Sequence, residues 1–413
     1  MPKFFYIARD SKGAKVSGAE EAVSSDELIS RLQSRGLIVI NVTLDYGKSV
    51  PSPRTDAFGA RRRFQHYGVN SQDLVTFSRQ LATMLGAAVP ILKSLDTIAR
   101  QIPSRRMYAV INEMVKDMEG GLSLHEAMAR HPKLFSELWV NLVETGEASG
   151  NLALVLERLA SYLERNAAFK KKIVSSLIYP VLLICASTAA LIFLTVKIIP
   201  TFADLFKGFN VTMPTFTRVL IDVSFFIRKY GLTVIGLIVV AFFFVLRPYL
   251  KTKEGRRILE KIEFSIPVFG EFYRGLVVER FSSSMSTLVE SGVPILYALE
   301  IAEHSVGNYT MADIVRKVKE EVREGKTLNH SLEESGFFEP MVVQMLAVGE
   351  EVGDLPQMLK RITVFYQEYA ETFLGRFTSM FEPIMLIFMG LVIGSMVVGM
   401  FLPIFQIASI GGH

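Results

Sequence analysis

Two long stretches of this sequence carry no charged side chain. The first runs from Ile173 to Val196 and the second from Pro383 to Gly412. Either stretch is long enough to cross the roughly 30 Å hydrocarbon layer of a bilayer as a helix. A charged side chain at the centre of such a helix costs about 2.5–3.5 kcal/mol, and a soluble core needs no apolar run of this length. The sequence therefore predicts membrane-spanning helices over 173–199 and 381–407.

A third, shorter apolar run extends from Tyr230 to Leu246 and has basic residues on both sides. Its length is at the short end of what spans a bilayer as a helix. We interpret it as a spanning helix over 230–246, and a re-entrant or interfacial helix is the alternative.

Basic residues are distributed unevenly around these runs, and an excess of Lys and Arg favours the cytoplasmic side. The tail after the last run has neither residue, whereas basic residues gather before the first run and after the second: Arg158, Arg165, Lys170, Lys171, Lys172, Arg247, Lys251, Lys253, Arg256, Arg257 and Lys261. The amino terminus is therefore predicted to be cytoplasmic. A loop over 200–229 and a tail over 408–413 are predicted to lie outside, on the opposite side of the membrane.

The sequence also repeats itself. The segment FSRQLATMLGAAVPILKSLDTIA, from Phe77, matches FSSSMSTLVESGVPILYALEIAE, from Phe281, and the match continues about 204 residues apart with a slip of one. Such self-similarity indicates a duplicated structural unit. We expect two homologous helix-bundle lobes, over 64–172 and 247–380, each followed by a spanning helix. Homologous lobes belong on the same side of the membrane, which favours a third crossing between them.

Matching prolines mark both copies. Pro90 and Pro294 fall where a helix is expected to begin, a position where the missing amide costs nothing. Pro180 and Pro383 lie early in the predicted spans and indicate a kink or a helix junction. Structural roles are thus predicted for six prolines: Pro90, Pro180, Pro200, Pro294, Pro383 and Pro403.

A small module precedes the repeats, over 1–46. Two strand-like runs are followed by SSDELISRLQSRG, a helix with Ser24 or Ser25 as its cap and Gly36 as its stop, and then by the strand-like LIVINVTL. The stretch 47–63, rich in Pro, Ser and charge, is predicted to be a linker. The fold class is therefore mainly α, in a polytopic membrane protein with a small α+β module at its amino terminus.

Signatures of catalysis and metal binding are incomplete. Gly325–Thr327 resembles the end of a phosphate-binding loop, but the first glycine of that motif is missing. His125 and His131 are six residues apart rather than the four of a metalloprotease helix. Cys185 is the single cysteine, and the net charge of +4 is too small to predict a nucleic-acid partner. We expect no enzyme activity, no cofactor and no metal site.

Each copy carries a Gly-Glu-x-x-Gly turn at the end of a helix. The glutamates, with other acidic residues nearby, are interpreted either as solvated turn residues or as a docking surface or weak cation site facing a partner. The final glycines are expected to supply a positive φ. The candidate partner-binding residues are Gly146, Glu147, Gly150, Gly349, Glu350 and Gly353.

Taken in order, these motifs resemble the inner-membrane platform family shared by type II secretion, as its F protein, and type IV pilus assembly. The resemblance covers nearly the whole chain. One departure is Glu382 where the first copy has Tyr179. Another is the second lobe's lack of the capping box that Ser123 and Glu126 form in the first.

The resemblance implies an oligomer in the bacterial inner membrane. Its implied partners are a cytoplasmic hexameric assembly ATPase that engages the lobes, pilin or pseudopilin subunits, and other inner-membrane assembly proteins. Membrane transport and a static scaffold are the alternative functions, and a transporter would need polar groups at mid-depth in the membrane. The choice between pilus assembly and protein secretion stays open.

Overall fold

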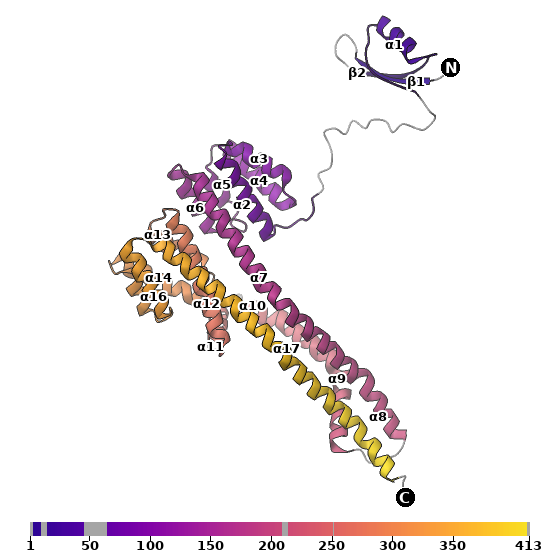
Figure 1. The fold of residues 1–413 in the computed structure, drawn as a ribbon, viewed down its shortest axis with the longest axis vertical. Helices are drawn as coiled ribbons and strands as arrows, with labels where there is room; N and C mark the ends of the chain where they lie inside the picture. Colours follow the sequence, from indigo (N-terminus) through magenta and orange to yellow (C-terminus); the bar gives the residue numbers. More distant parts are fainter. Residues whose placement is uncertain (1–2, 10–14, 45–63, 209–213, 251, 411–413) are drawn as a thin grey trace. The chain divides into compact units, whose positions relative to one another are not determined.

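The computed structural model describes residues 3–9, 15–44, 64–208, 214–250 and 252–410. The chain divides into two compact units, residues 1–63 and 64–413, each described here by itself (Figure 1). The predicted linker over 47–63 lies outside the described residues.

The described residues of the first unit form a three-stranded sheet with one helix. Strand β1 (Lys3–Arg9) lies between β2 (Lys15–Glu21) and β3 (Ile38–Leu44), antiparallel to both, and α1 (Ser25–Ser34) connects β2 to β3. The Ser24 hydroxyl accepts a hydrogen bond from the Glu27 amide at 3.3 Å, and Gly36 ends the helix with φ +77°. The predicted strands, helix, cap and stop are confirmed.

The second unit begins with a lobe of short helices. They are α2 (Ser71–Gly86), α3 (Ile91–Gln101), α4 (Arg105–Glu119), α5 (Leu124–Ala129), α6 (Glu137–Ala148) and the start of α7 (Leu152–Phe193). Its core holds an aromatic cluster, in which the rings of Phe77 and Trp139 lie 5.9 and 5.2 Å from that of Phe135.

The second lobe repeats this order after one additional helix. Its helices are α11 (Lys253–Ser265), α12 (Phe269–Glu290), α13 (Ile295–Ser305), α14 (Tyr309–Arg323), α15 (Leu328–Glu334), α16 (Pro340–Val352) and the start of α17 (Leu355–Ile410). Pro90 and Pro294 occupy the N-cap positions of α3 and α13, as predicted.

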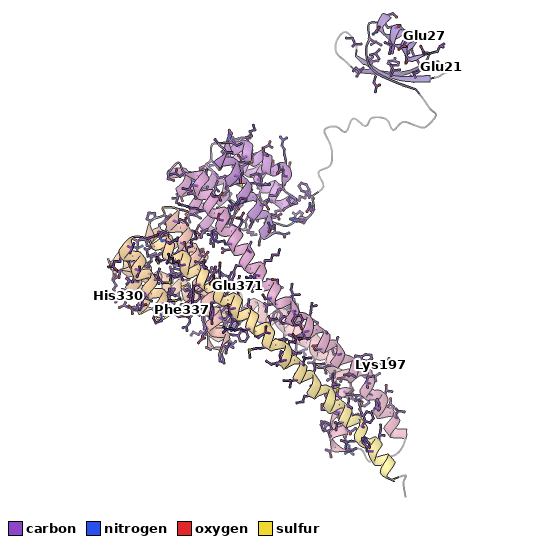
Figure 2. All side chains as sticks on the ribbon, in the orientation of Figure 1. Glu21, Glu27, Lys197, His330, Phe337 and Glu371 are labelled. Atoms are coloured by element: carbon purple, nitrogen blue, oxygen red, sulfur yellow. The ribbon has the colours of Figure 1, made fainter. Side chains whose placement is uncertain are left out.

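The long helices α7 and α17 leave their lobes and run side by side (Figure 1). Thr378 donates to the Ser176 carbonyl at 3.4 Å, and Lys172 pairs with Glu371. Figure 2 shows Glu371 near the lobes and Lys197 toward the other end of the pair. Among the described residues, two helices are long and apolar enough to cross a membrane, Leu152–Leu205 and Leu355–Phe405. The first contains the predicted span 173–199, and the second contains the predicted span 381–407 except for its last two residues.

Two of the prolines lie within the long helices. Pro180 lies inside α7 and Pro383 inside α17, so neither position is a helix junction, and the alternative interpretation, a kink, stays a prediction. Neighbouring helices and water in a membrane protein can satisfy the backbone groups that a helical proline leaves free. The chain instead changes geometry after α7, where a π-helical segment (Leu194–Ile198) precedes α8 (Ile199–Gly208), with Pro200 as its second residue.

The middle apolar run belongs to a longer helix than expected. Helix α9 (Thr215–Ala241) continues through a π-helical segment (Phe242–Leu246) into α10 (Arg247–Tyr249). Thr217 donates to the Gly399 carbonyl at 2.6 Å, and Ser224 donates to the Thr195 carbonyl. These bonds hold α9 against α17 and the π-helical segment that follows α7. Much of the predicted 200–229 loop is therefore helical.

The same helix supplies the candidate for a third crossing. Thr215–Gly231 and Gly236–Tyr249 are apolar enough together but bend by 49° between them. Both a spanning helix and a re-entrant segment fit this geometry, so the third crossing stays a prediction. At the other end of the chain, α17 continues to Ile410, and the remainder of the predicted 408–413 tail lies outside the described residues.

Candidate functional site

The Gly-Glu-x-x-Gly turns lie at the joint between each lobe and its long helix. A Cβ atom on Gly146 would lie 3.1 Å from the Cα of Leu152 and 3.1 Å from the Cβ of Val155, both on α7. A Cβ on Gly349 would lie 2.9 Å from the Cγ of Met358 on α17. Glycine at these two positions therefore lets the last short helix of each lobe pack closely on the long helix.

The glutamates next to these glycines each cap another helix of the same lobe. The Glu147 carboxylate accepts hydrogen bonds from the Leu124 amide at 2.8 Å and the His125 amide at 3.2 Å, and it lies 2.6 Å from the His125 ring nitrogen Nδ1. The Glu350 carboxylate accepts from the Leu328 and Asn329 amides at 2.9 and 3.2 Å. A carboxylate at a helix N-terminus satisfies free amides and favours the helix dipole.

This capping role was missed by the sequence reasoning, and it changes the interpretation of the turns. Glu147 and Glu350 are not freely solvated, because their oxygens are engaged within the lobe. The exposed acidic side chains of the turns are instead Glu144, Glu351 and Asp354. Within the described ranges, no three His, Cys, Asp or Glu side chains converge as a metal would require. The prediction that the turns bind a partner stays a prediction.

The last glycine of each turn allows the long helix to start at once. Gly150 has φ +70° and Gly353 has φ +77°, confirming the predicted conformation. A side chain is strained in this region, whereas glycine is not. Helix α7 begins two residues after Gly150, and α17 two residues after Gly353. Each turn thus combines a close helix crossing, a cap and a sharp reversal in five residues.

The short helix that Glu147 caps has a second cap of its own. Ser123 accepts from the Glu126 amide at 3.3 Å, and Glu126 accepts from the Ser123 amide at 2.8 Å, so the predicted capping box is confirmed. The hydrogen bond from the Ser123 amide lowers the pKa of Glu126. In the second lobe, Thr327 makes no such bond, and Glu350 supplies the cap.

An ion pair fastens the first lobe to α7. Arg79 on α2 donates to both carboxylate oxygens of Glu164, at 2.6 and 2.5 Å, and also to Glu157. The hydrogen bonds from Arg79 lower the pKa of Glu164. Because the pair is partly solvated, its contribution is near the upper end for surface pairs, about 1 kcal/mol.

Replacing this arginine tests the sign of that contribution. We expect Arg79→Met to lower the unfolding free energy by about 1 kcal/mol near neutral pH. A lowered pKa means that the stabilisation is present above the carboxyl's ordinary value of 4.5 and is lost as the pH falls through the folded-state pKa. Thermal unfolding of both proteins across this range measures it. A difference that persists unchanged in acid would contradict the assignment.

The second lobe places a glutamate in the packing between α12 and α17. Glu279 is 5% exposed and accepts a hydrogen bond from Gln367 at 2.7 Å. Burial raises the pKa of Glu279, against the effects of Gln367 and Arg280. The corresponding residue in the first repeat is Val75, an apolar side chain that is also buried. Ionised Glu279 therefore lowers the folding stability of the second lobe, and the first lobe has no equivalent charge.

We expect Glu279→Gln to raise the unfolding temperature at neutral pH. A carboxyl with a raised folded-state pKa binds protons more tightly in the folded protein, so wild-type stability falls as the pH rises above its ordinary value of 4.5. The glutamine keeps an acceptor for Gln367 and does not ionise. The two proteins should converge in acid, and unfolding temperatures measured from acid to neutral pH test this. A variant that is less stable throughout would show that the charge is not the cost.

The two lobes also contact each other. Tyr297 on α13 donates to the Asn141 side chain on α6 at 2.6 Å, and Tyr162 on α7 lies 3.3 Å from the Ser284 hydroxyl on α12. Arg158 on α7 donates to the Glu290 carbonyl at the end of α12. Buried apolar residues of both lobes form one continuous cluster. The lobes and the two long helices are therefore one packed body.

Comparisons with known proteins match the whole chain. The family model described as type II secretion system protein F matches twice, over residues 77–200 and 281–403, and the model of that protein's N-terminal domain matches residues 1–43. The double match confirms the repeat seen in the sequence.

Individual relatives come from two kinds of machine. The type IV pilus assembly protein PilC of Thermus thermophilus is 38% identical over 408 residues, which cover 98% of each chain. The corresponding protein of Myxococcus xanthus is 33% identical over 98% of this chain and 95% of its own. The type II secretion system protein F of Pseudomonas aeruginosa is 34% identical over all of both chains.

Proposed function

This chain belongs to the type II secretion system protein F family, and from that premise we propose that it is the inner-membrane platform of a type IV pilus or type II secretion machine. In this role it couples a cytoplasmic hexameric ATPase to the assembly of pilin or pseudopilin subunits into a filament. It acts without a catalytic site of its own. Other inner-membrane assembly proteins and further copies of the chain complete its proposed partners.

The observation that carries this proposal is the continuity of α7 and α17. Each helix starts in a lobe at a glycine turn and continues without a break into a segment apolar enough to cross the membrane. At Gly146 and Gly349, the last short helix of each lobe packs directly on the long helix. A force applied to a lobe is therefore transmitted through the long helix to its membrane segment. This geometry suits mechanical coupling better than it suits solute transport.

The proposed topology follows from the distribution of charge. We propose three crossings, with the third made by the bent helix between Thr215 and Tyr249, the amino terminus cytoplasmic and the carboxyl terminus periplasmic. Both lobes then face the cytoplasm, next to the basic clusters around Lys171 and Arg256.

The proposed contact with the ATPase includes the two glycine turns. Gly146, Glu147 and Gly150, and their counterparts Gly349, Glu350 and Gly353, shape the turns from within. The exposed Glu351 and Asp354 are the side chains that a basic partner surface would meet.

Copurification of the full chain with its assembly ATPase tests the function. The protein, solubilised in detergent, should retain the hexameric ATPase and change its turnover. The charge reversal Glu351→Lys/Asp354→Lys should weaken that retention. Glu324→Lys/Glu333→Lys, which changes the charge equally at two other exposed positions of the second lobe, serves as a matched surface control. Failure to retain the ATPase, together with movement of a solute into liposomes, would favour a transporter instead.

A further inference from the structure

The contact between the two lobes joins unlike faces of homologous units. The first lobe contributes α6 and α7, and the second contributes α12 and α13. In the repeat, α12 and α13 correspond to α2 and α3, and α6 and α7 correspond to α16 and α17. Among the described helices, these reciprocal elements do not pack on each other to a comparable extent. The lobes therefore meet head to tail, and each has one equivalent face that this contact leaves uncovered.

Burial shows the difference between covered and uncovered faces. Thr287 on α12 is 2% exposed, whereas its counterpart Thr83 on α2 is exposed. On the opposite side, Tyr162 is half-buried against the second lobe, whereas its counterpart Phe365 is 40% exposed. The residue types at these positions are similar, so the difference comes from the presence of the neighbouring lobe.

The uncovered face of the second lobe, which we call the α16–α17 face, keeps the amide and the arginine of the covered one and is apolar at the three positions where the covered face carries hydroxyl groups. It consists of Gln344, Val348, Arg361, Val364 and Phe365. Its three apolar side chains are 40% to 49% exposed, and part of it lines a shallow hollow. Exposed apolar side chains that lie together in a patch mark interaction sites more often than exposed apolar side chains that are scattered singly.

Arg361 is the counterpart of Arg158, which donates to the carbonyl of Glu290 at the end of α12. Arg361 is exposed, and in the described part of the chain it has no ion pair or hydrogen-bond partner. The residue equivalent to Glu290 is Gly86, the last residue of α2. A helix end of this kind attracts a cation, because its last carbonyls lack partners within the helix.

The uncovered face of the first lobe, which we call the α2–α3 face, contains that helix end. It consists of Thr83, Gly86, Leu92 and Lys93, all exposed. Leu92 is 37% exposed and Lys93 is the counterpart of Tyr297. The α16–α17 face of one molecule and the α2–α3 face of a second molecule are therefore the two halves of the contact that joins the lobes within one chain.

The membrane helices allow this contact to be repeated. Tyr179 on α7 and Glu382 on α17 occupy equivalent repeat positions and lie close enough to interact. Thr378 donates to the carbonyl of Ser176, which lies 202 residues earlier in the chain. Equivalent residues of the two copies are 203 residues apart at Gly146 and Gly349, so nearly equivalent residues face each other. The displacement from one repeat to the next is therefore lateral, with almost no shift along the helices. The same displacement applied to another copy would keep its membrane segments at the same depth.

We propose that a second copy of this chain docks its α2–α3 face on the α16–α17 face of the first, reproducing between molecules the contact that joins the lobes within one. Gln344 then faces the second copy's Lys93, and Arg361 reaches the carbonyl of its Gly86. A contact between unlike faces is heterologous, so it can be repeated from copy to copy and forms a ring where the rotation between copies closes. The proposal rests on the geometry of the lobes and of the two long helices, and it does not require the proposed function.

Paired cysteine variants test the proposal in membranes. In a Cys185→Ser background, one tagged chain carries Lys93→Cys and a second, differently tagged chain carries Gln344→Cys. With a short bismaleimide, co-expressed chains should give a mixed dimer, and either variant alone should give none. As a matched control, Asn141→Cys/Tyr297→Cys in one chain should cross-link within that chain, because it is the same pair at the known contact.

The outcomes separate clearly. A mixed dimer that disappears when Arg361→Glu/Phe365→Asp is added to the Gln344→Cys chain supports the proposal. A dimer formed by either single variant alone would mean a contact between like faces and would overturn it. So would the absence of mixed dimer when the intrachain control reacts fully, or a mixed dimer whose yield is unchanged by the Arg361 and Phe365 substitutions.

Discussion

Gly146→Leu and Gly349→Leu should each abolish filament assembly while leaving the protein in the membrane. A leucine at either position pushes the last short helix of a lobe away from the long helix, because even a single Cβ would meet α7 or α17 at 2.9–3.1 Å. Overpacking of this kind costs about 1–3 kcal/mol, and the better helix propensity of leucine offsets less than about 1 kcal/mol of it. Filament assembly in cells and the unfolding temperature of the solubilised protein measure the two effects.

Gly375→Leu is the matched control. Gly375 also lies in α17, but a Cβ there meets nothing within 4 Å. This variant should assemble filaments normally. If the Gly146 and Gly349 variants were as active as Gly375→Leu, the close crossing would not be the element that couples lobe to membrane. If they failed to reach the membrane at all, the crossing would be a folding requirement and not a coupling element.

Removal of the half-buried capping glutamates should have the second largest effect. Glu147→Ala leaves the amides of Leu124 and His125 without their acceptor, and Glu350→Ala does the same for Leu328 and Asn329. An unsatisfied buried amide costs about 1–3 kcal/mol, so each variant should lose about that much unfolding free energy. The two losses should add, because the sites lie in different lobes and share no partner.

A neighbouring glutamate separates capping from a general loss of negative charge. Glu351→Ala removes an exposed carboxylate next to Glu350 and should change the unfolding free energy by less than about 0.5 kcal/mol. Glu147→Gln keeps one acceptor oxygen and should fall between the wild type and alanine. Denaturant unfolding of the solubilised variants provides the comparison. Equal losses for Glu350→Ala and Glu351→Ala would rule out the capping role.

Features decided by short stretches of chain were predictable. The two longer membrane helices follow from uncharged runs around Ile184 and Leu391, since no other environment suits them. The helix caps at Ser24 and Ser123 and the positive φ of Gly150 follow from local backbone needs. The duplicated lobes follow from comparing the sequence with itself. In each case, the residues that reveal the feature are the same few residues that form it, or they occur in both copies of the repeat.

Features decided by distant residues needed the tertiary structure. Glu147 caps a helix that starts 23 residues earlier, and nothing local distinguishes it from a solvated turn residue. The extension of α9 back to Thr215 depends on its bonds to α17 and to the π-helical segment after α7.

The sequence by itself determined that this chain is a duplicated, mainly helical membrane protein, because apolar length and self-similarity are properties of the chain alone. Only the tertiary structure decided how the copies meet. The head-to-tail contact of the lobes, the level pairing of α7 with α17 and the partner of each capping glutamate depend on which surfaces fit together in space. That fit is a property of packed side chains, and no single segment encodes it.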